Sequence, residues 1–302
     1  IEQRRLDGGV LPQVVVAGKT KTCGQKNYNL LAAIRESAPD SEVFVFFDST
    51  HVVPTQHMRN LLAPVARGEA ETVTGYHHVW PKQKNVPTVG RAVTVLMMYM
   101  LQELPFVVTQ PWGGNMAITR KAFTELGVGD MWTENLVDDV SLALLLKEKK
   151  RDAMTVIEAS EITEIESITF REWAEWLRRQ WVYLHIYFPD LWLLSGLGFF
   201  MILLATLFAP VFIVWGAATG AFASLMLPAL AYLGVLFACF FFAWRSHPWP
   251  GNFVVWCAAS MATMLVGIIA HAGTWRKSHV CWRHYCYDVG PKGKVLGIHA
   301  KE

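Results

Sequence analysis

The sequence predicts a doubly wound α/β domain followed by a helical membrane domain. Two observations carry this prediction. From Phe188 to Ala272, only Asp190 and Arg245 carry a formal charge. The residues before this stretch instead alternate short β-branched and aromatic runs with segments of helical spacing, as soluble α/β domains do.

Three apolar runs can be cut from the charge-poor stretch, and each is close to the roughly 20 residues that a helix needs to cross a bilayer core. They are Leu191–Trp215, Phe222–Trp244 and Phe253–Gly273. Tryptophans near the ends of these runs favour membrane helices, because the indole ring prefers the headgroup layer. Three crossings would place the tail opposite the front domain, whereas the basic tail argues for the same side, so one run is expected to be either interfacial or re-entrant.

The front domain contains two short runs that are typical of buried parallel strands, Pro12–Ala17 and Val43–Phe47, with a helix expected between them at Asn27–Glu36. A second strand pair is expected at Glu71–Gly75 and Met154–Glu158. Further helices are expected at Ala92–Glu103, Arg120–Leu126 and Asn135–Lys149. This order predicts the doubly wound sheet.

Composition narrows the functional class. The net charge of +2 gives no reason to expect a nucleic-acid partner. The five cysteines show neither metal-type pairs nor the spacing of a secreted disulfide framework, so we expect a reducing compartment for the front domain. The chain begins at Ile1 without an initiator Met, so the N-terminus is expected to be cut.

Two acidic positions could carry chemistry. Asp48 directly follows the strand Val43–Phe47, at the edge where open α/β sheets bind ligands. Its carboxylate could hold a hard cation such as Mg²⁺ against a diphosphate, although an Asp that caps a turn is also common. Asp138 and Asp139 are adjacent on an apolar helical segment, so one of them is expected to have a raised pKa, as a general base requires. Solvated acids at a helix N-terminus are the equal alternative.

Two further segments have two readings each. Pro111–Ala117 contains a Gly-Gly pair that would let backbone amides approach a ligand, or that simply makes a tight turn. Phe170–Trp181 is either an interfacial helix with snorkelling arginines or a segment from which Arg178, Arg179 or Gln180 reaches a diphosphate.

Taken in order, these pieces resemble family 2 glycosyltransferases, most closely the ceramide glucosyltransferase group and its bacterial relatives. The matching residues are Lys26 with Asn29 and Leu30 (Lys-x-x-Asn-Leu), Asp48-Ser49, Gly75 with His78 and Pro81 (Gly-x-x-His-x-x-Pro), Asp138-Asp139, Trp181 (the end of Gln/Arg-x-x-Arg-Trp), and Trp282-Arg283 with Tyr287 and Val289 (Trp-Arg-x-x-x-Tyr-x-Leu). The similarity spans nearly the whole chain.

The resemblance implies a GT-A-like fold and a role for each site residue. Asp139 would be the catalytic base, with Asp138 beside it. Donor and diphosphate contacts would come from Lys26, Asp48, Arg178, Arg179 and Gln180, and Asp48 would also hold a divalent cation, Mg or Mn. The acceptor side would be formed by His78, Gly114, Asn115 and Trp181.

The chain departs from the family pattern at three places. Leu177 and Gln180 stand where the family has Gln or Arg and then Arg. Thr50 replaces the second acid of an Asp-x-Asp, with His51 a conceivable substitute ligand, so metal dependence is in doubt. The nucleotide-binding first strand has no counterpart after Ile1.

The implied protein is a membrane-bound inverting glycosyltransferase that moves a glucose-type sugar from a UDP-linked donor to a lipid hydroxyl such as that of ceramide. Its expected parts are a catalytic domain at 1–169, an amphipathic interfacial helix at 170–189, transmembrane helices at 190–273 and a basic tail at 274–302 that packs back near the catalytic domain. The expected partners are donor, lipid acceptor and membrane, without nucleic acid. The expected localisation is an integral membrane protein with a cytoplasmic catalytic domain, in the inner membrane if bacterial. A processive polysaccharide synthase and a catalytically silent membrane scaffold are the alternatives.

Overall fold

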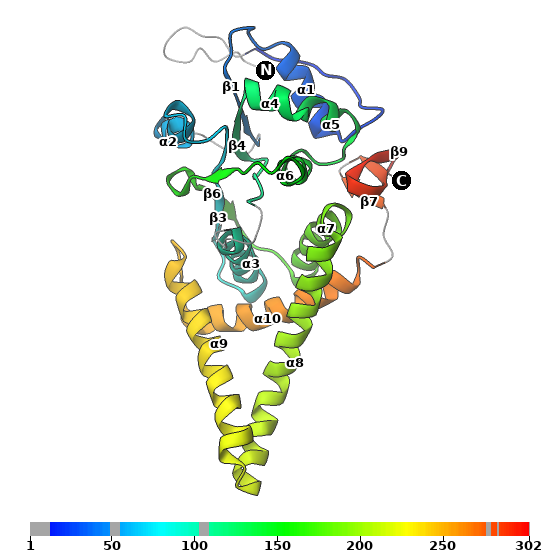
Figure 1. Cartoon of the computed structure of the whole chain (residues 1–302). Helices are drawn as coiled ribbons and strands as arrows, with labels where there is room; N and C mark the ends of the chain where they lie inside the picture. Colours follow the sequence, from blue (N-terminus) through cyan, green and yellow to red (C-terminus); the bar gives the residue numbers. More distant parts are fainter. Residues whose placement is uncertain (1–12, 49–54, 103–108, 276–278, 283, 302) are drawn as a thin grey trace.

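The computed structural model describes residues 13–48, 55–102, 109–275, 279–282 and 284–301. It shows a mixed α/β domain from which two long helices extend as a hairpin, while a third apolar helix lies across the base of the domain (Figure 1). The expected mixed α/β architecture with three apolar C-terminal helices is therefore confirmed. Thr50 and His51, like Arg283 and residues 1–12, lie outside the described residues.

The main sheet has the strand order β1-β4-β2-β5. Its strands are β1 (Val43–Phe47), β4 (Asn115–Thr119), β2 (Thr72–Thr74) and β5 (Met154–Thr155). β4 runs antiparallel to both β1 and β2, and β2 pairs with β5 in parallel. The expectation of a parallel doubly wound sheet is therefore wrong, because apolar runs predict that a strand forms but not in which direction it pairs.

The predicted strand at Pro12–Ala17 is also wrong for its described part. Residues 13–17 form no strand, and the side chains of Val14 and Val16 are 60% and 88% exposed. A β-branched run becomes a strand only when a neighbouring strand can take its backbone hydrogen bonds.

Two helical layers cover the main sheet. Phe44 and Phe46 of β1 face a core that includes α4 (Arg120–Leu126), α5 (Val128–Glu134) and α6 (Asp138–Lys149), with α1 (Gln25–Arg35) packed at its edge. Val43, Val45 and Phe47 point to the other face, toward α2 (Thr55–Ala66) and the 3₁₀ turn Ile157–Ala159. The alternation of side chains along β1 thus separates two cores.

A second sheet continues the chain toward the apolar helices. It pairs β3 (His77–Pro81) in parallel with β6 (Glu161–Ile165). Gly75 links β2 to β3 at a crowded point, where a Cβ atom would collide with the Ala159 carbonyl oxygen and the Asn115 amide. Below this sheet lie α3 (Val86–Gln102) and α7 (Phe170–Tyr187), and α7 begins with a capping box between Thr169 and Glu172.

The apolar region consists of α8 (Pro189–Thr219), the π-helical turn Phe222–Met226, α9 (Leu227–Ser246) and α10 (Phe253–Ala272). All three of its long helical stretches are long and apolar enough to span a membrane. α8 and α9 form the hairpin, whereas α10 lies across the open end of the hairpin, beneath α3 (Figure 1).

α10 has one face inside the protein and one face outside. Its buried residues include Trp256 and Ala259, which join the core around α3, and Val266 and Ala270, which pack with tryptophans of α7 and α8. The outer face is an apolar stripe with exposed Val254, Met261, Leu265 and Ile269. A helix with one face packed on the protein and the opposite face apolar and exposed fits the membrane surface better than the membrane interior.

The tail forms a small antiparallel sheet of β7 (His279–Trp282), β8 (Tyr285–Val289) and β9 (Val295–Ala300), with a 3₁₀ turn at Pro291–Gly293. This sheet packs on the front domain. The Tyr287 hydroxyl accepts a hydrogen bond from the Gln25 backbone N–H, and Leu136 N–H donates to the Gly293 carbonyl. Lys292 and Lys294 form ion pairs with Glu148 and Glu134.

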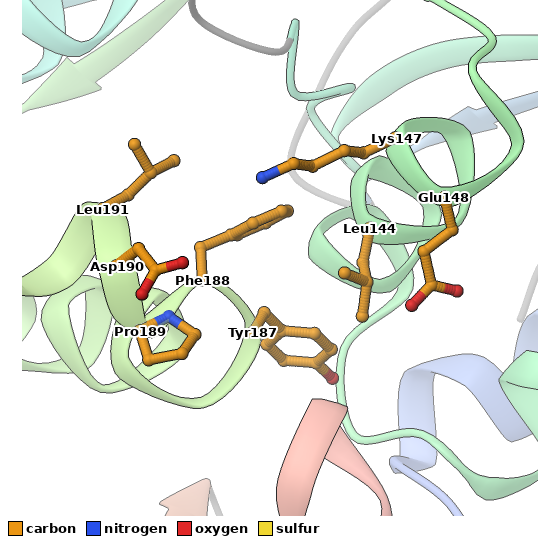
Figure 2. A pocket seen from close by; sticks show the side chains of 8 residues that line it. All are labelled: Leu144, Lys147, Glu148, Tyr187, Phe188, Pro189, Asp190 and Leu191. Carbon is orange, nitrogen blue, oxygen red and sulfur yellow. The ribbon is translucent and has the colours of Figure 1, made fainter.

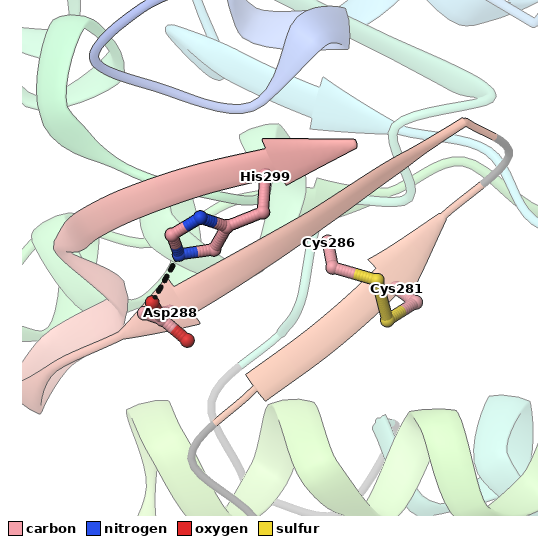
Figure 3. The surroundings of a disulfide bond; sticks show 4 residues. All are labelled: Cys281, Cys286, Asp288 and His299. Carbon is pink, nitrogen blue, oxygen red and sulfur yellow. Dashed lines mark hydrogen bonds and ion pairs between the residues drawn. A yellow bond between two sulfur atoms is a disulfide. The ribbon is translucent and has the colours of Figure 1, made fainter. Parts of the chain in front are cut away.

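A disulfide joins Cys281 of β7 to Cys286 of β8, which face each other across the two strands (Figure 3). The cysteine spacing had indicated no disulfide framework, and the structure corrects this by pairing two of the five cysteines. The spacing of the two residues did not show that a hairpin would place them opposite one another. The inference of a reducing compartment, which rested on unpaired cysteines, loses its basis.

The packing of the tail bears on membrane topology. Because the tail and the front domain form hydrogen bonds, they lie on the same side of any membrane, so the chain between them must cross an even number of times. α8 has 31 residues, which at about 1.5 Å per residue exceeds the roughly 30 Å hydrocarbon core. We therefore expect α8 and α9 to cross as a hairpin and α10 to lie along the surface.

Cysteine labelling on sealed vesicles tests this topology. Single substitutions Lys121→Cys on α4 and Lys292→Cys in the tail should react with a membrane-impermeant maleimide from the same side, above the background of the unsubstituted protein. Thr219→Cys, at the end of α8, serves as the control for the opposite side. Labelling of Lys121→Cys and Lys292→Cys from opposite sides would mean that α10 crosses as well.

Candidate functional site

Lys26 is the centre of a charged cluster that joins four separate parts of the front domain. Its ammonium nitrogen lies 2.9 Å from Asp48 Oδ1 and 3.0 Å from Asp138 Oδ2, and it donates a hydrogen bond of 3.0 Å to the Gly113 carbonyl. Lys26 comes from the first turn of α1, Asp48 from the end of β1, Gly113 from the loop before β4, and Asp138 from the start of α6. Three residues that were predicted separately are therefore brought together.

Asp139 lies beside this cluster but is held by backbone groups. Its Oδ2 accepts a 3.0 Å hydrogen bond from Gly113 N–H and its Oδ1 a 2.7 Å bond from Val140 N–H. Burial and the negative charge of Asp138 raise the pKa of Asp139 to about 6, although Lys26 and the two backbone donors act in the opposite direction. Asp138 is nearly fully buried, whereas Asp139 is partly exposed. Asp139 therefore combines a raised pKa with a residue surface that is not completely covered.

The local sequence explains how these groups are fixed. A Cβ atom on Gly113 would collide with the Asp138 carboxylate, and one on Gly114 would collide with the Trp112 ring. The Gly-Gly pair therefore brings the loop backbone close to the acids. The indole N–H of Trp132 donates to the Asp138 carbonyl and orders the start of α6.

Asp48 is the residue that was expected to hold a divalent cation. The Asp48 side chain is 42% exposed, and one of its oxygens already contacts Lys26. Among the described residues, no group of three or more His, Cys, Asp or Glu side chains could hold a metal ion. The positive charge next to Asp48 and Asp138 is the ammonium group of Lys26. Its pKa is lowered by burial but raised more by the surrounding acids, so it stays protonated.

A buried polar group lies behind the cluster. The Asn115 amide donates to the Ala159 carbonyl at 2.6 Å, and its oxygen lies 3.1 Å from His57 Nε2. His57 in turn lies 3.4 Å from Glu161, whose pKa is raised to about 7 by burial and by the charge of Asp48. The side chain of Asn115 is committed to these contacts, so the structure gives it a supporting place rather than the expected acceptor-facing one.

The remaining predicted residues lie apart from the acids. Trp181 packs edge-on against Phe199 and His271, in the core between α7, α8 and α10. Gln180 donates to the Trp176 carbonyl. His78 contacts the rings of Tyr99 and His247, and Arg178 lies against Gly273. The structure does not bring these residues to Asp139, whereas Arg179 extends toward the tail.

Aromatic residues that sequence reasoning missed lie near Asp139. Burial raises the pKa of Tyr76, and the charge of Asp139 raises it further. Burial also raises the pKa of Tyr183. The charge of Arg179 lowers this pKa, and the charge of Asp139 raises it. Trp112 stacks on His77 with ring centroids 4.2 Å apart. Tyr183 and Tyr187 share one face of α7, and this spacing was the available signal for their approach to α6.

A surface pocket lies at the junction of α6, α7 and α8 (Figure 2). It is lined by Leu144, Lys147, Glu148, Tyr187, Phe188, Pro189, Asp190 and Leu191. None of these residues belongs to the carboxylate cluster. Figure 2 shows the Lys147 chain over Phe188, so the pocket is walled by an apolar ring and the stem of a lysine.

No protein-family model and no curated protein matches this chain.

Proposed function

We propose that the protein is a membrane-bound glycosyltransferase that moves a sugar from a nucleotide-sugar donor to a lipid hydroxyl. The observation that supports this best is Asp139, a carboxyl with a pKa raised to about 6, next to the Lys26, Asp48 and Asp138 cluster. A general base that titrates near neutral pH and a fixed cation a few ångströms away suit an acceptor hydroxyl and an anionic leaving group. The apolar hairpin would hold this site at the membrane surface, where lipid headgroups are found.

The proposed reaction is a direct displacement. The acceptor oxygen forms a bond to the anomeric carbon as the bond from that carbon to the diphosphate oxygen breaks. The diphosphate leaves with the bonding electrons, and the hydroxyl proton passes to Asp139. Lys26 holds Asp48 and Asp138 in place and offsets negative charge near the leaving group. Attack from the face opposite the leaving group inverts the anomeric configuration.

Product analysis distinguishes this function from its alternatives. Membranes that contain the full chain would be incubated with a panel of radiolabelled nucleotide sugars, UDP-glucose included, and then extracted. A single sugar on an extracted lipid is the expected result. A labelled polymer would indicate a polysaccharide synthase. This result is not expected, because a hairpin of two helices forms no channel through which a polymer could leave. The absence of any labelled product would leave the scaffold alternative.

The pKa of Asp139 predicts the pH dependence of this reaction. A general base acts in its ionised form, so kcat should fall about tenfold per pH unit below pH 6 and level off above about pH 7. Initial rates at saturating donor between pH 5 and 8 measure this limb. A rate that stays flat down to pH 5 would show that no carboxyl with this pKa takes part.

A further inference from the structure

Two arginines on the neighbouring helices α3 and α7 stack on tryptophan rings. Both helices rest on α10, whose exposed apolar stripe faces away from the domain. The Arg91 guanidinium of α3 lies 4.6 Å from the ring centroid of Trp176 on α7. The Arg179 guanidinium, one turn further along α7, lies 4.6 Å from the ring centroid of Trp282 in β7. Arginines and rings thus alternate across three elements, and the stacking leaves the guanidinium edges available for hydrogen bonds.

Neither guanidinium forms an ion pair with any residue that the structure describes. No carboxylate among the described residues lies within ion-pair distance of Arg91 or Arg179, and the Nε atom of each is buried without a hydrogen-bond partner. The nearest acids of α7 are engaged elsewhere, because Glu172 caps its own helix and Glu175 pairs with Arg171. Buried donors are normally satisfied, so an unpartnered Nε atom in each of two neighbouring arginines indicates a place suited to an anion.

The two charges also repel each other. Burial, together with the charge of Arg179, lowers the pKa of Arg91 to about 10, which still leaves it fully protonated at neutral pH. Two partly buried positive charges that repel are unfavourable in the absence of an anion. A bound anion would remove this penalty and would accept hydrogen bonds from both guanidinium groups.

The position of the pair indicates where the anion comes from. Tyr183 of α7 is the described residue that links the two places, the arginine pair and the proposed base, because the charges of both Arg179 and Asp139 act on its pKa. On the other side, α3 and α7 rest on α10, whose outer stripe is exposed and apolar (Figure 1). Lys26 already supplies a cation at the end of β1, so the arginine pair is a second positive site, nearer the membrane.

We propose that Arg91 and Arg179 bind the phosphate of a membrane phospholipid. Naming this lipid as the acceptor rests on the proposed function. In that case the acceptor is a phospholipid whose headgroup also carries a hydroxyl, held by its phosphate while the hydroxyl reaches Asp139. A neutral lipid such as ceramide has no group for the two arginines.

Native mass spectrometry of the full chain in detergent tests the site without an activity readout. The probes are phosphatidylglycerol, which carries a phosphate and hydroxyls, and diacylglycerol, which lacks the phosphate. The variants are Arg91→Met, Arg179→Met and the double substitution. Arg171→Met is the matched control, because Arg171 lies on the same helix but is exposed and paired with Glu175. Melting temperatures of all variants check that they fold.

The wild type and Arg171→Met should each retain phosphatidylglycerol more strongly than diacylglycerol. Each single variant should lose about tenfold in phosphatidylglycerol affinity, as expected when a charge-assisted hydrogen bond is removed, and the double variant should retain no more of it than of diacylglycerol. Equal retention by the double variant and by Arg171→Met would overturn the proposal. So would a double variant that keeps phosphatidylglycerol but loses affinity for UDP, because the anion would then be the diphosphate of the donor. The binding result stands whether or not the protein transfers sugar, so the two proposals can fail separately.

Discussion

Lys26→Met is expected to destabilise the protein by about 2 kcal/mol and to abolish most of its activity. Removing one partner of a buried ion pair leaves the other charge uncompensated, which typically costs about 3 to 5 kcal/mol. The Lys26 side chain is 37% exposed, so solvent screens part of this effect and we expect the smaller value. The pKa of Asp139 should also rise further, because Lys26 is one of the groups that lower it.

Thermal melting of the detergent-solubilised full chain measures this effect. Lys121→Met is the control, since Lys121 forms an exposed i,i+4 pair with Glu125 at 3.9 Å and its loss should change little. Adding Asp138→Asn to Lys26→Met should recover part of the lost stability, because the buried charge is then gone. If Lys26→Met has the same melting temperature as the control variant, Lys26 does not hold the cluster together.

The parts of the site that could be predicted are those with a local signal. The apolar run Val43–Phe47 predicted β1 and therefore the place of Asp48, and the adjacent acids Asp138 and Asp139 were visible at the start of α6. The resemblance selected Lys26. What the sequence did not show is that the Lys26 ammonium group joins Asp48 to Asp138, because their proximity depends on how α1, β1 and α6 pack.

Features that depend on long-range pairing could not be predicted. The direction of β4 joins segments whose own patterns do not name a partner. That the tail packs back on the front domain was expected, but its ion pair with Glu148 of α6 was not. The disulfide of Cys281 and Cys286 is local, and it was missed because the hairpin that places the two residues opposite one another was not predicted. The apolar composition of α10 fits a crossing and a surface helix equally, and its buried face and the packing of the tail separate the two. Arg91 carried no signal at all, since a lone arginine on a helix is usually solvated.

The second large effect is expected for Asp139→Asn, which should lower kcat by about 10² to 10⁴-fold while leaving donor affinity nearly unchanged. The loss corresponds to roughly 3 to 5 kcal/mol of barrier. A base takes the acceptor proton only as the transition state forms, so its removal affects turnover more than ground-state binding. The Asn side chain can still accept the hydrogen bond from Gly113 N–H. Steady-state rates and calorimetric titration with UDP separate the two quantities.

Asp138→Asn is the matched comparison for this prediction. Asp138 is buried against Lys26 and acts on its neighbour through its charge, so its substitution should lower kcat less. If Asp138→Asn has no activity while Asp139→Asn keeps more than about a tenth of wild-type turnover, the base is Asp138 and not Asp139.

Stability should change in the opposite direction to activity. The pKa of Asp139 is raised from 3.8 to about 6 on folding, so the folded protein binds this proton more tightly than the unfolded chain does. Ionisation of Asp139 therefore lowers the free energy of unfolding progressively between about pH 4 and pH 6, and the full loss is present at pH 7.5. Asp139→Asn should melt at a higher temperature than the wild type at pH 7.5 and at a similar one at pH 4.

The measurement that tests the account most directly is the transfer of radiolabel from a nucleotide sugar to extracted lipid by wild type and Asp139→Asn, in membranes that hold equal amounts of each full chain at pH 7.5. Wild-type membranes should place label in the organic phase, and Asp139→Asn membranes at least about a hundredfold less. Equal labelling by both would place the chemistry away from the cluster around Lys26. The absence of lipid label with every donor in the wild type would contradict the proposed function itself.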